Sequence, residues 1–255
     1  MKILCIGNSF SRDVSTYIHQ IAKAAGKDLD IYVLYIPGCP INVHYQNLIS
    51  NEKAYEFYKN GANTPLFNCS LIEGLDFEKW DYITYQQRSY DSGDETTFFP
   101  ELPLLMKGVK AHTNAKFILH MTWSYAKSFS HEKYGENPMD QEAMDNDIFK
   151  AYKDVSEQLS IPYIISTGKA IKEARKIYGD NLTRDGYHLN EMGRTLSGYL
   201  WAYYFLGLDT DTSKFKPSGY SYDETTTPVS DQDLPVLQDI AKKIIEENKE
   251  NNLNG

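Results

Sequence analysis

The sequence predicts an α/β protein in which helices cover both faces of a largely parallel sheet, and two observations support this fold class. Short apolar runs alternate with longer segments of helical periodicity. Each run is brief and bounded by polar or turn residues, as is typical of parallel strands that are buried on both faces. The predicted strands are residues 2–6, 30–36, 81–86, 116–121 and 162–166.

The segments between and after these runs have the periodicity of amphipathic helices. In residues 11–25, Val14, Ile18 and Ile21 fall on one helical face, and Gly26 is expected to end the helix. The clearest helix covers residues 191–206, whose apolar positions recur every three to four residues. Further helices are predicted at residues 43–58, 102–109, 142–159, 169–177 and 231–247.

The chain shows no internal repeat and no segment with the composition of a domain linker. Residues 209–230 are rich in Thr, Ser, Asp, Tyr and Pro, a composition that predicts a long loop. We predict that this loop borders the mouth of the ligand site described below. We therefore expect a main domain over residues 1–207, with a C-terminal loop and helix, residues 208–255, packed on the same domain.

Charge and hydropathy exclude several classes of partner. The formal net charge is −9, whereas binding to nucleic acid or to an anionic membrane surface requires clustered Lys and Arg. No stretch approaches the roughly 18 apolar residues of a membrane span. The N-terminal apolar run is too short for the core of a signal peptide, which predicts a cytoplasmic location unless a leader was removed.

The segment after the first predicted strand contains the first candidate catalytic residue. In open α/β sheets, ligands bind beyond the carboxyl ends of the strands. Ser9 lies there, in the sequence Gly7-Asn8-Ser9-Phe10-Ser11, between a strand and a helix. It can act as a nucleophile whose own N–H stabilises an oxyanion, or it can simply cap the helix, a role that suits Ser11 better.

Asp185 and His188, just before the clearest helix, favour the catalytic interpretation. A serine hydroxyl needs a base, usually a histidine, and the base needs an acceptor on its other ring nitrogen. An Asp three residues before a His can supply that acceptor. The alternative is a turn residue and a surface histidine beside a helix capped by Asn190.

Together these residues resemble the SGNH (GDSL-type) hydrolase superfamily. The resemblance rests on Ile6-Gly7-Asn8-Ser9-Phe10-Ser11 and on Asp185-Gly186-Tyr187-His188-Leu189-Asn190, followed by Gly193, and it covers about residues 1–207. It implies a flavodoxin-like three-layer α/β/α sandwich with a five-stranded parallel sheet in the order 2-1-3-4-5. It also implies a triad of Ser9, His188 and Asp185.

In the superfamily, the oxyanion hole combines the nucleophile's N–H, a Gly N–H after the second strand and an Asn side chain after the third. Gly38 matches the Gly, although it can equally serve only a tight turn. The expected Gly-x-Asn-Asp motif is absent, and an ungapped alignment places Tyr90 at the Asn. Gln87 is predicted to replace the Asn, with Gln86, Tyr90 and Arg88 as alternatives.

The resemblance implies a serine esterase that needs no metal and no organic cofactor. The Gln-Gln variant is similar to carbohydrate-esterase branches of the superfamily, so an O-acetyl group on a sugar is the expected substrate. Trp123 and Tyr90 are expected in the substrate site, where Trp123 can stack on a sugar ring or can simply pack in the core. The second hypothesis is an inactive carbohydrate- or small-molecule-binding module. A mononucleotide binder is disfavoured because residues 7–11 lack phosphate-cradling glycines.

Overall fold

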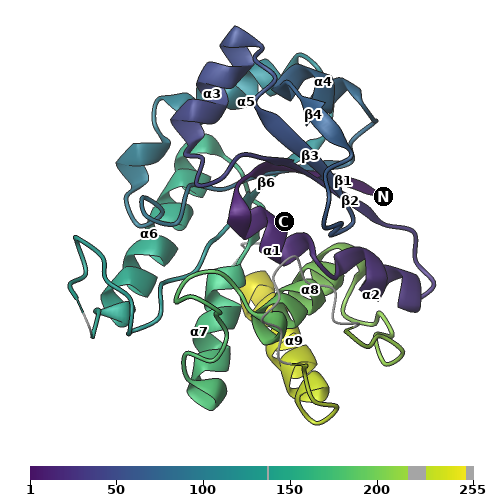
Figure 1. The fold of residues 1–255 in the computed structure, drawn as a ribbon, viewed down its shortest axis with the longest axis vertical. Helices are drawn as coiled ribbons and strands as arrows, with labels where there is room; N and C mark the ends of the chain where they lie inside the picture. Colours follow the sequence, from purple (N-terminus) through teal and green to yellow (C-terminus); the bar gives the residue numbers. More distant parts are fainter. Residues whose placement is uncertain (137, 218–227, 251–255) are drawn as a thin grey trace.

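The structure, a computed structural model, describes residues 1–136, 138–217 and 228–250 and contains one mixed sheet between two layers of helices (Figure 1). Seven strands form the sheet: β1 (Lys2–Gly7), β2 (Asp30–Tyr35), β3 (Tyr55–Lys59), β4 (Phe67–Cys69), β5 (Tyr82–Tyr85), β6 (Lys116–His120) and β7 (Ile164–Ile165). Their order across the sheet is β4-β3-β2-β1-β5-β6-β7.

All five predicted strands are present, but the predicted five-stranded sheet is wrong in strand number and order. The pairs β1–β2, β1–β5, β5–β6 and β6–β7 are parallel, whereas β3 and β4 extend the β2 edge in antiparallel pairs. β1 lies in the middle of the sheet and is buried along nearly its whole length. The carboxyl ends of β2, β1, β5 and β6 therefore lie side by side at one edge.

The two additional strands explain why the predicted helix at residues 43–58 is wrong in its second half. Helix α3 (Ile41–Ser50) ends at Asn51, which adopts the left-handed conformation with φ 52°. β3 then follows, with Tyr55 and Phe57 buried on one face. Over this short length the tyrosine-rich run is compatible with both helical and strand periodicity. Its antiparallel pairing with β2 makes it a strand.

The helices form two layers, one on each face of the sheet (Figure 1). α3, α4 (Leu71–Asp76) and α5 (Glu101–Lys110) cover one face. The other face carries α1 (Ser9–Ser15), α2 (Ile18–Ala24), α7 (Thr167–Tyr178), α8 (Glu191–Leu206) and α9 (Asp233–Glu250). The remaining helices, α6 (Gln141–Leu159) and the short 3-10 helix η1 (Glu95–Phe98), pack against each other.

The predicted helix over residues 11–25 is divided into α1 and α2. The hydroxyl of Thr16 donates to the carbonyls of Arg12 and Asp13, and the Ser15 hydroxyl donates to Arg12 as well. Side-chain hydroxyls that occupy the carbonyls of the last turn compete with continuation of the helix. The break gives α1 its own direction while it carries Ser9 at its first residue.

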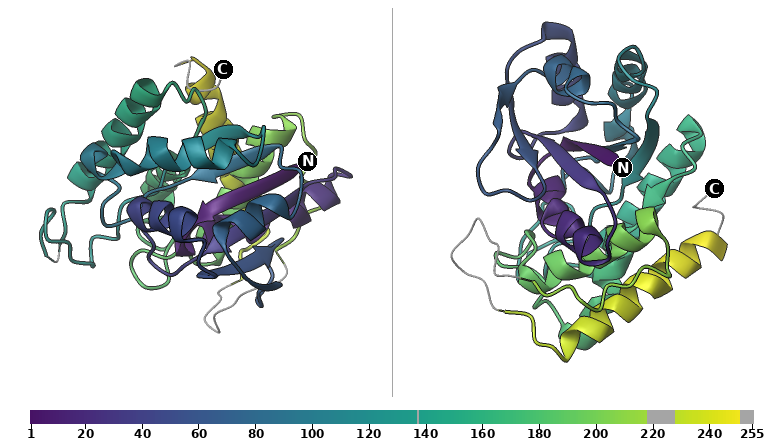
Figure 2. Two further views of the ribbon diagram at one scale, coloured as in Figure 1. Left: turned by 90° about the horizontal axis from the view of Figure 1, so that it is seen from above. Right: turned by 90° about the vertical axis from the view of Figure 1, so that its right-hand side faces the viewer.

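The C-terminal helix α9 packs along α7 and α8, as the yellow and green helices of Figure 2 show. Its buried residues include Leu237, Ala241 and Ile245. Ten residues of the predicted loop over residues 209–230, namely 218–227, lie outside the described residues, so the predicted position of this loop at the mouth of the site is not tested. Among the described residues, no helix combines the length and apolar character that crossing a membrane requires.

Candidate active site

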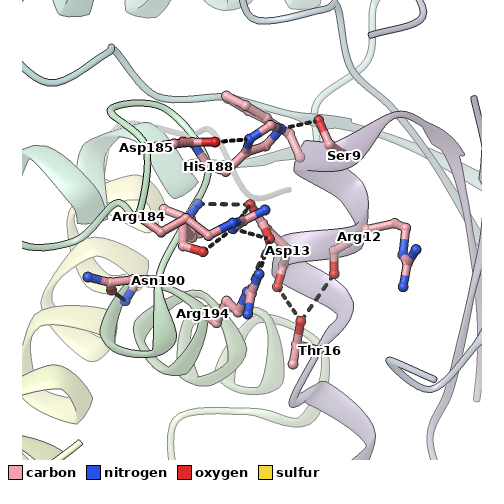
Figure 3. A network of polar contacts seen from close by, with 12 residues as sticks. Ser9, Arg12, Asp13, Thr16, Arg184, Asp185, His188, Asn190 and Arg194 are labelled. Carbon is pink, nitrogen blue, oxygen red and sulfur yellow. Dashed lines mark hydrogen bonds and ion pairs between the residues drawn. The ribbon is translucent and has the colours of Figure 1, made fainter. Parts of the chain in front are cut away.

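Ser9, His188 and Asp185 form a continuous hydrogen-bonded chain at the carboxyl edge of the sheet (Figure 3). The distance between His188 Nε2 and Ser9 Oγ is 2.8 Å, and that between His188 Nδ1 and Asp185 Oδ2 is 2.6 Å. The carboxylate accepts a hydrogen bond from Nδ1–H. This leaves Nε2 unprotonated and able to accept a hydrogen bond from the serine hydroxyl. This is the geometry of a nucleophile, a base and the acid that orients the base.

The turn that carries Asp185 is held by hydrogen bonds to its own backbone. Asp185 Oδ1 accepts the backbone N–H groups of His188 at 2.8 Å and of Tyr187 at 3.2 Å. Gly186, with φ 96°, supplies the left-handed conformation that the turn requires. Partial burial raises the pKa of Asp185, but the hydrogen bonds from His188 and Tyr187 outweigh this effect, so the pKa lies below its ordinary value.

Asn8 joins the nucleophile to the neighbouring loop after β2. It caps α1 by accepting the Phe10 N–H at 3.0 Å, and its amide donates to the carbonyl of Cys39 at 3.2 Å. The predicted cap at Ser11 is therefore wrong, because Ser11 is buried inside the helix and donates to Gln86. The Asn8 side chain thus ties Ser9 to the turn that contains Gly38.

Gly38 lies in a tight turn with φ 58°, a conformation that side chains other than glycine rarely adopt. The turn is closed by the Cys39 N–H, which donates to the carbonyl of Ile36 at 3.3 Å. Within the described part of the chain, the backbone N–H groups of Ser9 and Gly38 form no hydrogen bond. Both residues line the same cavity, so both groups are available to a ligand there.

The cavity beside the triad has a volume of about 560 Å³, within the roughly 300–1,000 Å³ typical of small-molecule sites. Its walls combine tyrosine rings with polar side chains. The lining residues are Asn8, Ser9, Tyr35, Pro37, Gly38, Arg88, Ser89, Tyr90, Tyr187 and His188.

Gln87, the predicted oxyanion donor, does not line this cavity. Its amide nitrogen donates to the carbonyl of Thr97 at 2.7 Å and to the Thr97 hydroxyl at 3.1 Å. Its side-chain oxygen accepts the N–H groups of Ile41 and Arg88. These bonds occupy the buried Gln87 side chain in joining α3 to the loop after β5, so the prediction for this residue is wrong.

Gln86, the first alternative, also faces inward. Its amide nitrogen donates to Asn8 Oδ1 at 2.7 Å, and its side-chain oxygen accepts the Ser11 hydroxyl at 2.6 Å. His120 Nδ1 lies 3.0 Å from the same oxygen, which makes the imidazole a second donor to it. The Gln86 amide therefore holds the Asn8 side chain in place by a hydrogen bond and is not available to a substrate.

Trp123 does not line the cavity, contrary to prediction. The side chain is fully buried and stacks on Phe10 with a centroid distance of 4.0 Å. Its ring N–H donates to the carbonyl of Tyr187 at 2.7 Å, so it supports the loop that carries His188. Tyr90 does line the cavity and is 43% exposed, but its hydroxyl donates to Glu132 at 2.8 Å.

Asp13 is a functional residue that sequence reasoning missed. It is fully buried one helical turn after Ser9 and accepts the Leu189 N–H at 2.8 Å. Arg184 and Arg194, which flank the Asp185–His188 turn, also pair with its carboxylate (Figure 3). The cluster therefore joins the nucleophile helix to the turn of the base. An acid beside the apolar positions of the predicted helix over residues 11–25, such as Val14 and Ile18, is the signal that could have revealed it.

The comparisons with known proteins agree with this fold. The chain is similar to a DUF4886 family protein from Bacteroides uniformis whose crystal structure is known. The two sequences are 30% identical, the TM-score between the structures is 0.84, and the match covers 96% of this chain and 95% of that chain. It is also similar to a putative SGNH hydrolase from Slackia heliotrinireducens, at 21% identity and a TM-score of 0.55, covering 79% of this chain and 97% of that chain. A search of curated proteins finds no significant match.

The second likeness shows the fold alone, so the predicted SGNH resemblance is confirmed at the level of the fold. The carbohydrate-esterase branch remains a prediction. A family described as "Domain of unknown function (DUF4886)" matches residues 2–229, and we conclude that the chain belongs to this family.

Proposed function

We propose that the protein is a serine esterase that hydrolyses small acyl esters, with O-acetylated carbohydrates as its substrates. One observation carries this proposal: Ser9, His188 and Asp185 come from distant parts of the chain and meet in hydrogen-bonding geometry beside an open cavity. A serine that only caps a helix has no need of a histidine supported by a carboxylate.

The reaction follows from these contacts. His188 Nε2 accepts the Ser9 proton while Ser9 Oγ bonds to the ester carbonyl carbon, and the carbonyl π electrons move to the oxygen. Collapse of the tetrahedral intermediate expels the alcohol, which takes the proton from His188. A water molecule, deprotonated by His188, then attacks the acyl-Ser9 carbonyl. When this second tetrahedral intermediate collapses, the bond to Ser9 Oγ breaks, Ser9 takes the proton back from His188, and the carboxylic acid leaves. Asp185 stabilises the imidazolium in both halves of the reaction.

The oxyanion is bound by the backbone N–H groups of Ser9 and Gly38. Both groups lie at the cavity, and neither has a hydrogen-bond partner among the described residues. Fixed donors directed at developing charge are among the largest contributions to acyl-transfer catalysis. The stiff turn around Gly38 and its link to Asn8 support this role, because they hold the two donors in one arrangement.

A carbohydrate substrate is supported by the walls of the cavity. Tyr35, Tyr90 and Tyr187 present rings that have an apolar face and a polar tip, a combination that suits a polyhydroxylated ring. Arg88 lines the same cavity and pairs with Asp91, so its charge is balanced and spare N–H groups can meet sugar hydroxyls.

We expect the protein to release acetate from an acetylated xylo-oligosaccharide and to hydrolyse p-nitrophenyl acetate faster than p-nitrophenyl palmitate. None of the described residues that line the open cavity has a long aliphatic side chain, so a long acyl chain finds little apolar surface to bury. Acetate release is measured by an enzyme-coupled assay, with Ser9→Ala as the blank. An inactive binding module on the same fold would bind the oligosaccharide in calorimetry and release no acetate.

We expect log kcat/KM to fall on the acid side with a limiting slope of one. The reaction needs a single base in its unprotonated form, and one protonation removes it. Asp185 adds no second step to this limb, because, despite its partial burial, the hydrogen bonds from His188 and Tyr187 hold the pKa of its carboxyl below the ordinary value. The measurement is a pH–rate profile with p-nitrophenyl acetate. A flat profile, or a limiting slope of two, would contradict the assigned roles.

A further inference from the structure

The loop after β5 lies where a third oxyanion donor is needed. β1, which leads to Ser9, is flanked by β2 on one side and by β5 on the other. The loop after β2 supplies Gly38, so the loop after β5 approaches the cavity from the opposite side of Ser9. Arg88, Ser89 and Tyr90 of this loop all line the cavity.

Most polar side chains near this position are already engaged. The amide groups of Gln86 and Gln87 donate to Asn8 and Thr97, and the Asn8 amide donates to Cys39. The Tyr90 hydroxyl donates to Glu132. Each of these groups would have to break a hydrogen bond before it could reach a substrate oxygen.

Ser89 differs because its hydrogen-bond partner, the Tyr125 hydroxyl, can act as the donor. Ser89 Oγ lies 2.8 Å from the hydroxyl oxygen of Tyr125, a buried side chain. Burial raises the pKa of Tyr125 to about 12, so the phenol keeps its proton at working pH. Ser89 is the one acceptor in hydrogen-bonding range of that phenol among the described residues. The distance allows either hydroxyl to donate, but only donation from the phenol satisfies the buried Tyr125 O–H, and in that arrangement Ser89 keeps a proton for a ligand in the cavity.

We propose that the Ser89 hydroxyl, oriented by Tyr125, is the third donor of the oxyanion hole, in the role that the superfamily gives to an asparagine. This inference rests on the proposed esterase function. Two contacts hold the backbone of this loop. The Ser92 hydroxyl holds the carbonyl of Ser89 at 2.9 Å, and Arg88 pairs with Asp91.

The test compares Ser89→Ala with Ser89→Thr, which retains a hydroxyl. Loss of one oxyanion donor is expected to lower kcat by roughly 100- to 1,000-fold while KM changes little, and threonine should restore most of kcat. A trifluoromethyl ketone, whose hemiketal carries the oxyanion, should lose affinity by a similar factor in the alanine variant. Tyr125→Phe should lower kcat by a smaller factor, because Ser89 keeps its hydroxyl and loses only its orientation.

Ser92→Ala serves as the control for loosening of the loop. It removes a hydrogen bond to the same backbone but leaves the Ser89 hydroxyl in place. Its effect on kcat should be at least tenfold smaller than that of Ser89→Ala. An equal effect would mean that Ser89 acts by holding the loop and would overturn the proposal.

Failure of this inference is distinguishable from failure of the proposed function. If Ser9→Ala is inactive while Ser89→Ala keeps the wild-type kcat and inhibitor affinity, the esterase stands and Ser89 is not the donor. If Arg88→Ala then shows the loss of kcat, the guanidinium holds the oxyanion instead. If the wild-type protein shows no Ser9-dependent hydrolysis, both proposals are overturned together.

Discussion

Replacement of Ser9 by alanine is expected to lower kcat for p-nitrophenyl acetate by at least about 10⁴-fold. The variant has no atom that can form the acyl-enzyme, and what remains is catalysis by oxyanion binding and by water. The structural effect is small, because the alanine loses one half-buried hydrogen bond to His188, worth about 1 kcal/mol. The melting temperature should therefore fall by only about 2–4 °C.

Ser15→Ala is the matched control for this substitution. Ser15 lies on the same helix, and its hydroxyl donates to the carbonyl of Arg12, far from the base. Ser15→Ala should keep kcat within about threefold of wild type, since a change of that size corresponds to less than 1 kcal/mol. A fluorophosphonate probe should label wild type and Ser15→Ala on Ser9, as shown by mass mapping, and should not label Ser9→Ala. Wild-type turnover in Ser9→Ala would end the assignment of the triad.

Asp13→Asn is expected to lower the free energy of unfolding by about 3–5 kcal/mol. The Asp13 and Arg194 side chains are both fully buried, and the distance between Arg194 Nη2 and Asp13 Oδ1 is 3.0 Å. Arg184 lies 3.2 Å from the same carboxylate oxygen. Removing the negative charge takes the Asp13 carboxylate away from two guanidinium groups, one of them fully buried, which is far costlier than the loss of an exposed ion pair.

The measurement for Asp13→Asn is urea unfolding followed by circular dichroism, with a fall in melting temperature of roughly 6–20 °C as the second readout. Asp154→Asn is the matched control, since Asp154 pairs with Lys150 on the exposed face of α6. That substitution should cost less than about 1 kcal/mol. The double variant Asp13→Leu/Arg194→Met, which removes the two fully buried charges of the cluster, should be more stable than Asp13→Asn. If Asp13→Asn lowers the free energy of unfolding by no more than Asp154→Asn does, the cluster does not stabilise the contact between α1 and the His188 turn.

The position of the predicted triad can be traced to local signals in the sequence. A continuous apolar run followed by Gly7-Asn8-Ser9 predicts a buried strand that delivers a side chain to the sheet edge. The Asp185-to-His188 spacing lets one tight turn bring the carboxylate to the ring nitrogen. Such short-range features depend on a few neighbouring residues, so they can be recognised without knowing the rest of the fold.

The oxyanion side of the site could not be predicted in this way. Gln86 and Gln87 both have the right chemistry, and which way an amide points depends on its partners. Those partners, Thr97 for Gln87 and Asn8 for Gln86, belong to other elements. The same holds for Trp123, since the stacking of Phe10 against its ring determines that it is core rather than cavity wall.

By itself, the sequence determined the α/β class and the five parallel strands, because strand burial and helix periodicity are local properties, whereas the triad is implied by the resemblance to a known superfamily and stays a prediction. Only the tertiary structure decided that β3 and β4 extend the sheet, that Asp13 is buried between two arginines, and that Ser89 rather than a glutamine faces the cavity. These outcomes depend on which elements lie beside one another. A strand or a buried charge finds its partner in another element of the chain. A short window of sequence therefore does not contain both partners.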